Sequence, residues 1–519
     1  MNTSPVVLSR NERRRLFGKI RLQGPWGASR RRTRRGAQQQ VGYAAVAAAE
    51  VMEERALMSA TFGMAVDIGN ETGDSFAFGV ATDAAGNSYV TGSFSGTCDF
   101  DQANSHAGDT DILTARGSGD IFIAKYAADS SLVWVTRMGG DAVASAGVTD
   151  VGRAVEVDAS GNVYVAGSFR GTADFGSTVL SSSSLVDQDG FVTKFNSSGT
   201  IQWAKSWGIV GTGNAGDDTG NGVGIDSSGN VYAMGYRAGT GGGFDLLKFN
   251  SSGTAVWSKT IAASAGVSSS MTVDSSGNVF LAGSFTGTAD FDPGPKTKNQ
   301  SSGPSSASFA VELNSSGNFQ WVSTFVGQTV GSTSGFSSAQ SIALDGSGNV
   351  LVGGYYKYTV DFKPGGGVVN LPAVGGGYIA KLNSSGGLVW AKALESSTIS
   401  SGGVRGLDTD SAGNVYATGS FSGTIDLNPG SGSDIRTSNG GADMYVVKLA
   451  TSGNYSWAET FGGPGFISVF DLAVGPGNTL HLAGYLSDTV DFDPDPLSTY
   501  IVSTPGTTRH AYLLRLGQV

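Results

Sequence analysis

Residues 158–175 read DASGNVYVAGSFRGTADF, and close copies of this stretch recur along the chain. Each copy combines a hairpin turn, D-x-x-G-N, with a strand of β-branched and aromatic residues that ends at a glycine. Self-similarity of this kind predicts a solenoid or a propeller, because a single unit cannot bury its apolar face alone. The anchor glycine of each copy occurs at Gly92, Gly167, Gly235, Gly283, Gly354, Gly419 and Gly484.

The second copy shows the content of one unit. Strand-like residues occupy 153–157, 163–169, 191–195 and 201–205. The turn D-x-x-G-N joins the first two of these stretches, N-S-S-G joins the last two, and no segment has a helical period. Four-stranded units in radial repetition are the blades of β-propellers. The sequence therefore predicts an all-β fold, a seven-bladed β-propeller of four-stranded blades.

The two ends of the repeat region complement each other. The seventh unit ends at residues 512–516 and lacks the tryptophan-bearing strand that follows in other units. Residues 58–63 (MSATFG) align with that strand in the sixth unit, residues 457–462 (WAETFG). We therefore expect this N-terminal strand to complete the last blade and to close the ring. The predicted domains are a disordered basic targeting segment, residues 1–55, and the propeller, residues 56–519.

The charge of the chain is divided between two unlike parts. Residues 1–60 contain 12 Lys and Arg against 4 Asp and Glu, whereas the remainder contains 21 against 39. An acidic body repels a phosphate backbone, so we expect the propeller to have no nucleic-acid partner. No apolar run approaches the roughly 18 residues of a membrane helix, so no membrane span is expected. The single cysteine, Cys98, excludes an intramolecular disulfide. We also expect the protein to be a monomer.

The repeated pattern resembles a known family. D-x-S-G-N-V-Y-V-x-G-x-F, followed by D-x-F-V-x-K-F-N-S-S-G-x-x-x-W-A-K, resembles the SBBP (seven-bladed β-propeller) repeats of bacterial surface and secreted proteins. The resemblance covers residues 58–519, implies the fold, and carries no common catalytic set. Residues 52–60 (MEERALMSA) are similar to the LEPR-XLL segment of many planctomycete exported proteins, with Glu54 in place of the proline. This second resemblance implies export, to the cell surface or the exterior.

The long connections of variable length are expected on one face of the propeller, and a protein or glycan ligand would bind there or at the mouth of the channel. Three of these connections carry carboxylates two residues apart: Asp99 and Asp101, Asp290 and Asp292, and Asp491, Asp493 and Asp495. That spacing suits calcium, because alternate side chains can converge on one ion. It also suits turns in which aspartate ends a strand and caps the next residues. Lys363 and Asn428 replace the second aspartate in two other units, which favours the turn.

Catalytic chemistry has little support in the sequence. The three histidines, His106, His481 and His510, lie in different contexts, and none accompanies a serine or cysteine motif. A lysine recurs in the third strand, as at Lys194 and Lys248, and is interpreted as an edge charge that discourages pairing. The predicted function is an exported, non-enzymatic binding or structural module without a cofactor other than calcium. The alternatives are a lyase or hydrolase with its site at the channel mouth, and a folded carrier module with no ligand of its own.

Overall fold

The computed structural model describes residues 60–518 except 70–72, 103–109, 141–149, 184–186, 209–216, 238–241, 364–365, 373–374, 398–401, 496 and 507. The predicted targeting segment, Met58 and His106 therefore lie outside the described residues. Residues 58–519 form one compact unit. The described part consists of strands, turns and one short 3-10 segment, Pro476–Asn478, so the predicted all-β class is confirmed.

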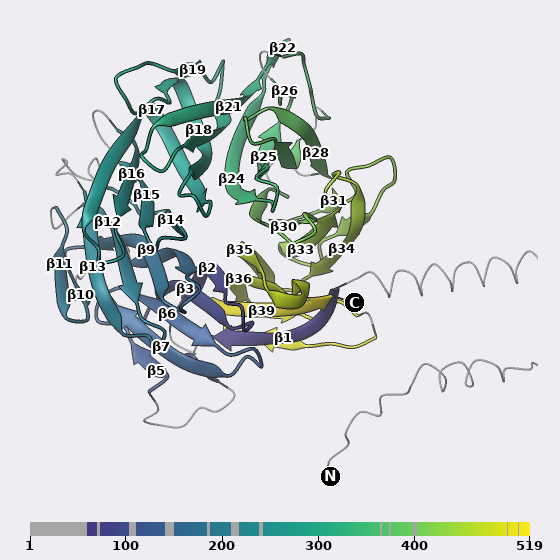
Figure 1. Cartoon of the computed structure of the whole chain (residues 1–519). Coiled ribbons are helices and arrows are strands. Elements are labelled where there is room, and N and C mark those ends of the chain that lie inside the picture. Colours follow the sequence, from purple (N-terminus) through teal and green to yellow (C-terminus); the bar gives the residue numbers. More distant parts are fainter. Residues whose placement is uncertain are drawn as a thin grey trace, which may run out of the picture. The chain divides into compact units, whose positions relative to one another are not determined.

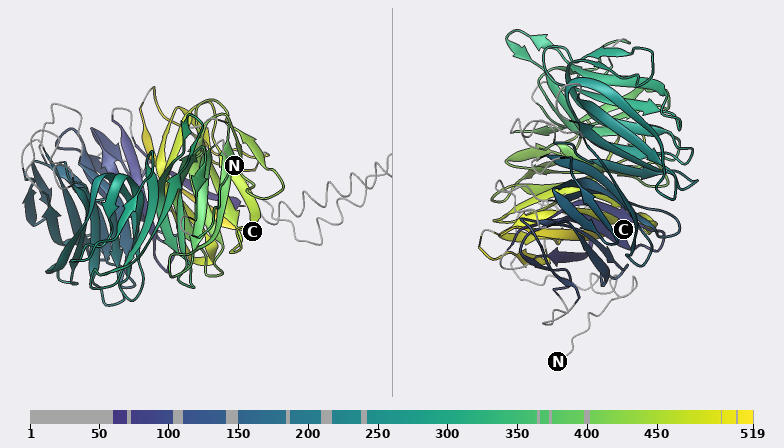
Figure 2. Two further views of the ribbon diagram at one scale, coloured as in Figure 1. Left: turned by 90° about the horizontal axis from the view of Figure 1, so that it is seen from above. Right: turned by 90° about the vertical axis from the view of Figure 1, so that its left-hand side faces the viewer.

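Each repeat unit contributes strands to antiparallel sheets, and the sheets follow one another within residues 58–519 (Figure 1, Figure 2). The units are numbered 1–7 by their anchor glycines. The first strands are β2 (Ser75–Thr82), β8 (Val151–Val157), β14 (Gly222–Ile225), the later part of β17 (Ala255–Val273), β24 (Phe336–Leu344), β29 (Val404–Thr409) and β35 (Phe466–Val474). The second strands, which carry the anchor glycines, are β3 (Ser88–Phe94), β9 (Val163–Arg170), β15 (Val231–Arg237), β18 (Val279–Asp290), β25 (Val350–Lys357), β30 (Val415–Phe421) and β36 (Leu480–Ser487).

The third and fourth strands complete these sheets. The third strands are β6 (Asp120–Tyr126), β12 (Gln188–Phe195), β16 (Gly243–Phe249), β20 (Ala307–Leu313), β27 (Gly376–Leu382), β33 (Asp443–Leu449) and β39 (His510–Gln518). The fourth strands are β7 (Leu132–Met138), β13 (Ile201–Trp207), the early part of β17, β21 (Phe319–Gly327), β28 (Leu388–Ser396), β34 (Tyr455–Phe461) and β1 (Ala60–Ile68). The turn between first and second strands needs a positive φ at its fourth residue, which glycine supplies in most units and Asn478 supplies in unit 7 with φ 60°.

Short strands extend the second strands outward. They are β4 (Thr97–Asp99) with β5 (Ile112–Thr114), β10 (Thr172–Phe175) with β11 (Thr178–Ser181), β19 (Asn299–Ser301), β26 (Val360–Asp361), β31 (Thr424–Asp426) with β32 (Ile435–Thr437), and β37 (Thr489–Asp491) with β38 (Ile501–Ser503). A separate hairpin, β22 (Thr329–Val330) with β23 (Thr333–Ser334), lies in the connection between β21 and β24. Units 3 and 4 share one sheet, because β17 runs without interruption from the fourth strand of unit 3 into the first strand of unit 4. The anchor glycines of these two units are the closest in sequence, which leaves no connecting loop between the two strands.

The N-terminal strand belongs to the sheet of the last unit. That sheet has the order β1-β39-β36-β35, and the β1–β39 ladder runs from Ala60 opposite Gln518 to Ile68 opposite Ala511. Ile68 is fully buried, in a cluster with Val90 of unit 1 and Leu513 of unit 7. The first strands contact one another in chain order from β2 to β35, and β35 contacts β2 in turn.

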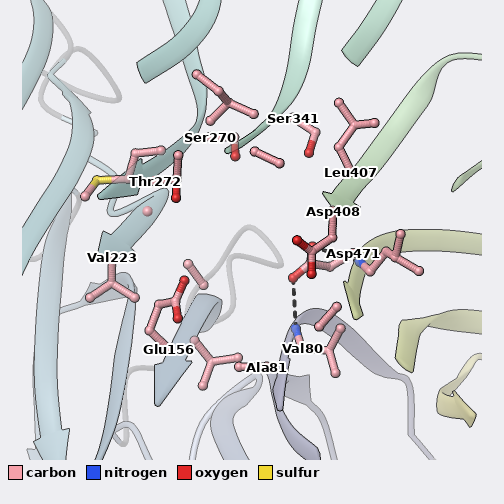
Figure 3. A pocket seen from close by; sticks show the side chains of 18 of the residues that line it. Val80, Ala81, Glu156, Val223, Ser270, Thr272, Ser341, Leu407, Asp408 and Asp471 are labelled. Carbon is pink, nitrogen blue, oxygen red and sulfur yellow. Dashed lines mark hydrogen bonds between the residues drawn. The ribbon is translucent and has the colours of Figure 1, made fainter. Parts of the chain in front are cut away.

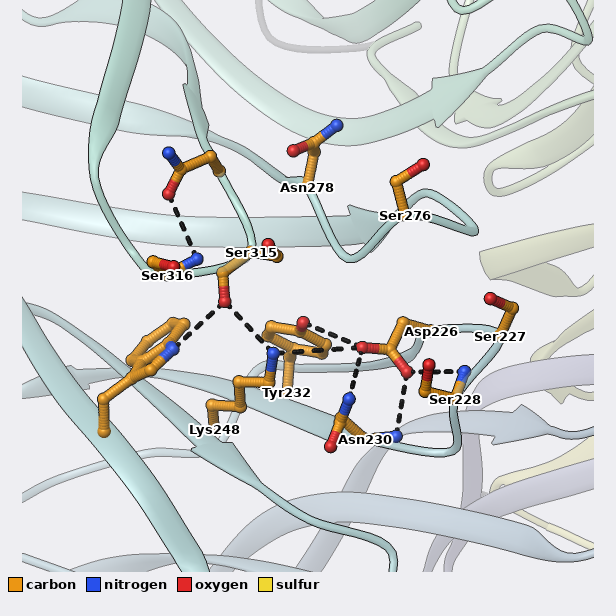
Figure 4. Close-up of polar contacts among 12 residues, drawn as sticks. Asp226, Ser227, Ser228, Asn230, Tyr232, Lys248, Ser276, Asn278, Ser315 and Ser316 are labelled. Atoms are coloured by element: carbon orange, nitrogen blue, oxygen red, sulfur yellow. Dashed lines mark hydrogen bonds and ion pairs between the residues drawn. The ribbon is translucent and has the colours of Figure 1, made fainter.

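Neighbouring units are joined by a contact that recurs with the tryptophans (Figure 4). In unit 3, Trp257 Nε1 and Lys248 Nζ both donate to the carbonyl oxygen of Ser315 in the unit 4 turn, at 3.2 and 3.1 Å. Lys248 also lies over the Tyr232 ring and 3.9 Å from Asp226 Oδ2. The interpretation of the lysine as an edge charge was wrong, because β16 is paired on both sides and the lysine contacts the next unit. Corresponding tryptophan bonds are made by Trp134, Trp203, Trp321 and Trp390.

Hydrogen bonds within the hairpin turn of unit 3 favour the ionised form of its aspartate, Asp226. Burial alone would raise the pKa of Asp226, but hydrogen bonds from Asn230, Tyr232 and Ser228 bring that pKa below its ordinary value. These donors lie within six residues along the chain, so the turn satisfies its own carboxylate.

No helix in the described part of the chain is both long and apolar enough to span a membrane.

Candidate functional site

The first strands of units 1–7 line one cavity of about 480 Å³. Figure 3 shows its wall, with labelled side chains from every unit: Ala81, Glu156, Val223, Thr272, Ser341, Leu407 and Asp471. A cavity of several hundred Å³ has the size of a small-molecule or oligomer binding site. The variable connections lead into these strands, so the residues near the strand beginnings lie toward the face on which binding was expected.

A β-bulge determines which side chains enter this cavity. In six of the first strands the ladder skips one residue, which lies five positions before the first residue of the hairpin turn. A bulge bends its strand and redirects the skipped side chain. The skipped residues that line the cavity are Phe78, Arg153, Gln340, Arg405 and Phe470, and Asn221 holds the same position in unit 3.

The anchor glycines are a consequence of this geometry. A Cβ atom at Gly92 would lie 1.8 Å from the backbone oxygen of Phe76, which precedes the bulge at Phe78. At Gly167 the same atom would lie 1.9 Å from the oxygen of Val151, two residues before Arg153. No side chain fits at such distances, so the backbone that forms the bulge requires glycine on the neighbouring strand. The anchor glycine on a second strand therefore indicates where the bulged residue lies on the neighbouring first strand.

Four of the cavity residues form a continuous row across units 6, 7, 1 and 2. The Arg405 guanidinium lies 5.4 Å from the centre of the Phe470 ring, and the Arg153 guanidinium lies 5.9 Å from that of Phe78. The two rings are 4.8 Å apart between centroids. We call this row, Arg405–Phe470–Phe78–Arg153, the Arg–Phe arc. Each arginine is placed on an aromatic face, where the ring quadrupole attracts a cation.

The arginines of the arc have no acidic partner. Neither Arg153 nor Arg405 makes an ion pair or hydrogen bond with any residue that the structure describes, and Arg153 Nε is buried without an acceptor. Burial lowers the pKa of both guanidiniums, which means that the surrounding protein disfavours their charge. Both side chains are partly exposed, so they can be reached from the cavity. A partly desolvated cation without a counter-ion costs free energy that an anionic ligand would offset.

Three carboxylates line the cavity nearer the hairpin turns. Burial raises the pKa of Glu156 to about 8, and the charges of Asp408 and Asp471 add to this rise. Burial raises the pKa of Asp471 to about 7, although backbone N–H groups of Val80 and Leu472 hydrogen-bond to it. Asp408 has a pKa of about 6, raised by burial against hydrogen bonds from Val474 and Thr409.

Two of these carboxylates connect neighbouring units. Asp408 Oδ2 accepts a hydrogen bond from the Val474 backbone at 2.7 Å, and Asp471 Oδ2 accepts one from the Val80 backbone at 2.9 Å. These bonds satisfy backbone donors on the exposed edges of first strands, and the second of them joins unit 7 to unit 1. Asp408 and Asp471 therefore have a structural role, which Glu156 lacks.

The described histidines lie away from the cavity. His481 is fully buried, with Nδ1 2.7 Å from Ser88 Oγ and Nε2 3.1 Å from Thr479 Oγ1. Burial lowers its pKa to about 3, so the ring is neutral at ordinary pH. His510 Nδ1 lies 3.0 Å from Asp67 Oδ1 and joins β39 to β1. Both histidines are thus held in contacts between strands.

The aspartates predicted to bind calcium lie in the outer extensions, remote from the cavity wall. Asp290 Oδ1 accepts hydrogen bonds from the backbone of Asp292 at 3.1 Å and of Lys298 at 2.7 Å. Asp491 Oδ1 accepts equivalent bonds from Asp493 at 3.0 Å and Tyr500 at 2.9 Å. These are the contacts expected of turn aspartates.

The second and third aspartates continue the same pattern. Asp493 Oδ1 accepts from the Asp495 backbone at 3.0 Å, and Asp292 Oδ1 accepts from Gly294 at 2.8 Å. Asn428 makes the corresponding bond to Gly430 at 2.9 Å, so the turn does not require a charge there. Within the described ranges, no group of three or more His, Cys, Asp or Glu side chains is placed to hold a metal ion. Calcium binding stays a prediction.

The first aspartate of each extension also joins two units. Asp290 is paired with Ala262 of the preceding unit, Asp361 with Val326, and the remaining pairs are Asp426 with Glu395, Asp491 with Gly462, Asp174 with Gly139, and Asp99 with Gly69. The last pair connects unit 1 to the N-terminal strand. This backbone pairing accounts for the recurrence of the position whether or not an ion binds.

Sequence reasoning missed the Arg–Phe arc and the cavity carboxylates. An alignment of the first strands on their hairpin turns could have found the arc. In that alignment one column, five residues before the turn, contains Arg153, Arg405, Phe78 and Phe470. In units 4 and 5 that column holds serine and glutamine.

Comparison with known proteins assigns no family: no family model and no curated protein matches the chain. Among solved structures, U3-55K is similar with a TM-score of 0.44 and 8% identity over 88% of this chain and 100% of that one. An ulvan lyase of a polysaccharide lyase family has a TM-score of 0.40 and 11% identity over 80% and 92%. An inactive virginiamycin B lyase from Staphylococcus aureus, with quinupristin, has a TM-score of 0.37 and 9% identity over 87% and 99%. Likenesses at these levels assign neither a ligand nor an activity to this chain.

Proposed function

We propose that residues 56–519 are a closed seven-bladed β-propeller of the SBBP type, exported to the cell surface or beyond, that binds a ligand in its central cavity. Support for the ring comes from the seven sequence units, the first strands that share one cavity, and the pairing of β1 with β39. Support for export comes from the LEPR-XLL-like segment at residues 52–60.

The Arg–Phe arc is the observation on which the binding function rests. A propeller with a purely structural role has no need for two unpaired guanidiniums on a cavity wall, because each is costly without a counter-ion. Asn221 and Gln340 continue the same ring with amide groups that can donate and accept hydrogen bonds. An apolar platform with a few placed polar groups is the composition of a ligand site.

The second candidate function is an enzyme, a lyase or hydrolase, at the same cavity. Glu156 and Asp471 favour it, because carboxyl groups with pKa values of about 8 and about 7 can act as proton donors near neutral pH. The binding function is preferred because Asp471 is committed to the bond with Val80. Glu156→Gln distinguishes the two: turnover of a bound ligand that this variant abolishes, with binding retained, would establish the enzyme.

The test of the binding function is a screen of the full chain against glycan and extracellular-protein arrays. Gln340→Trp places a large side chain in the cavity ring, and Val133→Trp adds the same side chain at an exposed outer-strand position. We expect a captured ligand to be lost with Gln340→Trp and kept with Val133→Trp. A ligand that both variants retain would place binding elsewhere and contradict the proposed site.

We also propose that the extension of unit 7 binds calcium through Asp491, Asp493 and Asp495. Three carboxylates within five residues repel one another, and a cation that binds only the folded state stabilises it by mass action. Addition of calcium at about 1 mM, the range of extracellular modules, is expected to raise the Tm, and Asp493→Asn is expected to reduce the rise. An unchanged Tm with calcium, against a magnesium control, would leave these residues with the turn role alone.

A further inference from the structure

We propose that the ligand of the cavity is an acidic oligosaccharide, whose carboxylate or sulfate groups bind Arg153 and Arg405 while its sugar rings pack on Phe78 and Phe470. This inference rests on the proposed binding function and names the ligand class of the same site.

The order of residues in the Arg–Phe arc determines the shape of the ligand. The two phenyl rings, 4.8 Å apart, lie between the two guanidiniums. A ligand that contacts both arginines along the arc therefore also passes the two rings. It carries anionic groups separated by a body that packs against aromatic faces. A short chain of sugar rings with acidic substituents has this form.

The chemistry of each element fits such a chain. Guanidinium presents a planar fork of donors that matches the oxygens of a carboxylate or a sulfate. The C–H groups on one face of a sugar ring carry partial positive charge, and the negative face of a phenyl ring attracts them. Asn221, Gln340 and Ser341 line the remaining wall and can hydrogen-bond to sugar hydroxyls.

The arginines are available to an external anion. Arg153 and Glu156 lie on the same strand, as do Arg405 and Asp408, yet no ion pair joins either couple. The cavity is therefore cationic where the first strands begin and acidic where they end. Long polyanions are disfavoured by the acidic body, which carries 39 Asp and Glu against 21 Lys and Arg beyond residue 60. The cavity volume of about 480 Å³ also favours a short chain.

Titration calorimetry on the full chain tests the inference with three tetrasaccharides: tetragalacturonic acid, a sulfated galactotetraose and neutral galactotetraose. We expect at least one anionic probe to bind about tenfold or more tightly than the neutral one, and the difference to shrink with salt. The carboxylated and sulfated probes distinguish the two anionic groups. Arg153→Gln and Arg405→Gln are each expected to weaken the anionic probe about tenfold or more.

Arg116→Gln is the matched control, because Arg116 is a surface arginine, 43% exposed, whose ion pair with Asp174 lies outside the cavity. Arg153→Lys keeps the charge without the fork and is expected to bind with an intermediate affinity. A thermal melt of each variant separates loss of binding from loss of fold.

Three results would overturn the inference: equal affinity for the neutral and anionic probes, unchanged affinity in both folded arginine variants, or no binding of either anionic probe at millimolar concentration. Neutral galactotetraose that binds and is lost with Gln340→Trp would overturn the ligand class while supporting the proposed binding function. Failure of every array and probe would overturn both.

Discussion

Ile68→Ala tests whether the N-terminal strand completes the sheet of the last unit. Ile68 is the last residue of β1, lies opposite Ala511 and is fully buried. Its cluster includes Val90 and Phe122 of unit 1 and Leu513 of unit 7. The side chain thus contributes to the contact between the first and last units, and its truncation weakens that contact directly.

The expected loss can be estimated from its burial. Truncation of a fully buried isoleucine to alanine costs about 2–5 kcal/mol, through lost apolar transfer and the cavity left behind. Unfolding entropy of roughly 2 cal/mol/K per residue amounts to roughly 1 kcal/mol/K for a cooperative unit of this length. Ile68→Ala is therefore expected to lower the Tm by roughly 2–5 °C.

Calorimetry and urea unfolding of the full chain measure this loss, with Ile379→Ala as the matched control. Ile379 lies within β27 in the middle of the repeat region and is also fully buried. A closed ring predicts comparable losses for the two variants. If Ile379→Ala lowers the Tm while Ile68→Ala has the same Tm as the wild type, β1 is not part of the cooperative structure and the closure argument is wrong.

Three further outcomes follow from the fold. Deletion of residues 1–55 should leave the Tm unchanged, whereas deletion of residues 1–64 should lower it by exposing the edge of β39; equal midpoints would contradict closure. Trp457→Ala should lower the free energy of unfolding by about 3–5 kcal/mol, because this side chain is only 7% exposed. Trp321→Ala should lower it by less, because that side chain is only half-buried, and urea unfolding compares the two variants. The pKa of Asp471, about 7 in the folded protein and above its ordinary value, predicts stability that is present below about pH 4 and lost as pH rises through 7. Asp471→Asn should reduce the slope of the Tm profile between pH 4 and 8, to which Glu156 and Asp408 also contribute, and an unchanged slope would show that this carboxyl does not titrate as expected.

Much of the fold could be predicted because each unit repeats its local chemistry. The hairpin aspartate, the positive-φ residue and the anchor glycine recur at fixed offsets, and Asn478, which stands in place of the turn glycine in unit 7, also has a positive φ. The alignment of residues 58–63 with a fourth strand predicted the strand that pairs with β39, which is β1. Local patterns of this kind are readable because the donors and acceptors lie within a few residues of one another.

Contacts between units were not predictable in the same way. The recurring lysine was interpreted as an edge charge, but Lys248 reaches Ser315 in another unit, 67 residues away. The uninterrupted β17 strand was also missed, because the sequence shows a short interval and not the direction in which the chain leaves it. Such features depend on how one sheet is placed beside the next, which no single unit encodes.

The cavity depends both on local patterns within each unit and on contacts between units. The anchor glycine is needed because the bulge brings a backbone oxygen against the second strand, and in five of the first strands the bulged residue lines the cavity. The scaffold therefore repeats while the residue it presents does not: phenylalanine, arginine, asparagine, serine, glutamine, arginine and phenylalanine occupy that position in units 1–7. Under the proposed function, ligand specificity resides in this column, where the units differ. Phe78 and Phe470, at the centre of the Arg–Phe arc, come from the first and last units, so the arc depends on the contact between these two units.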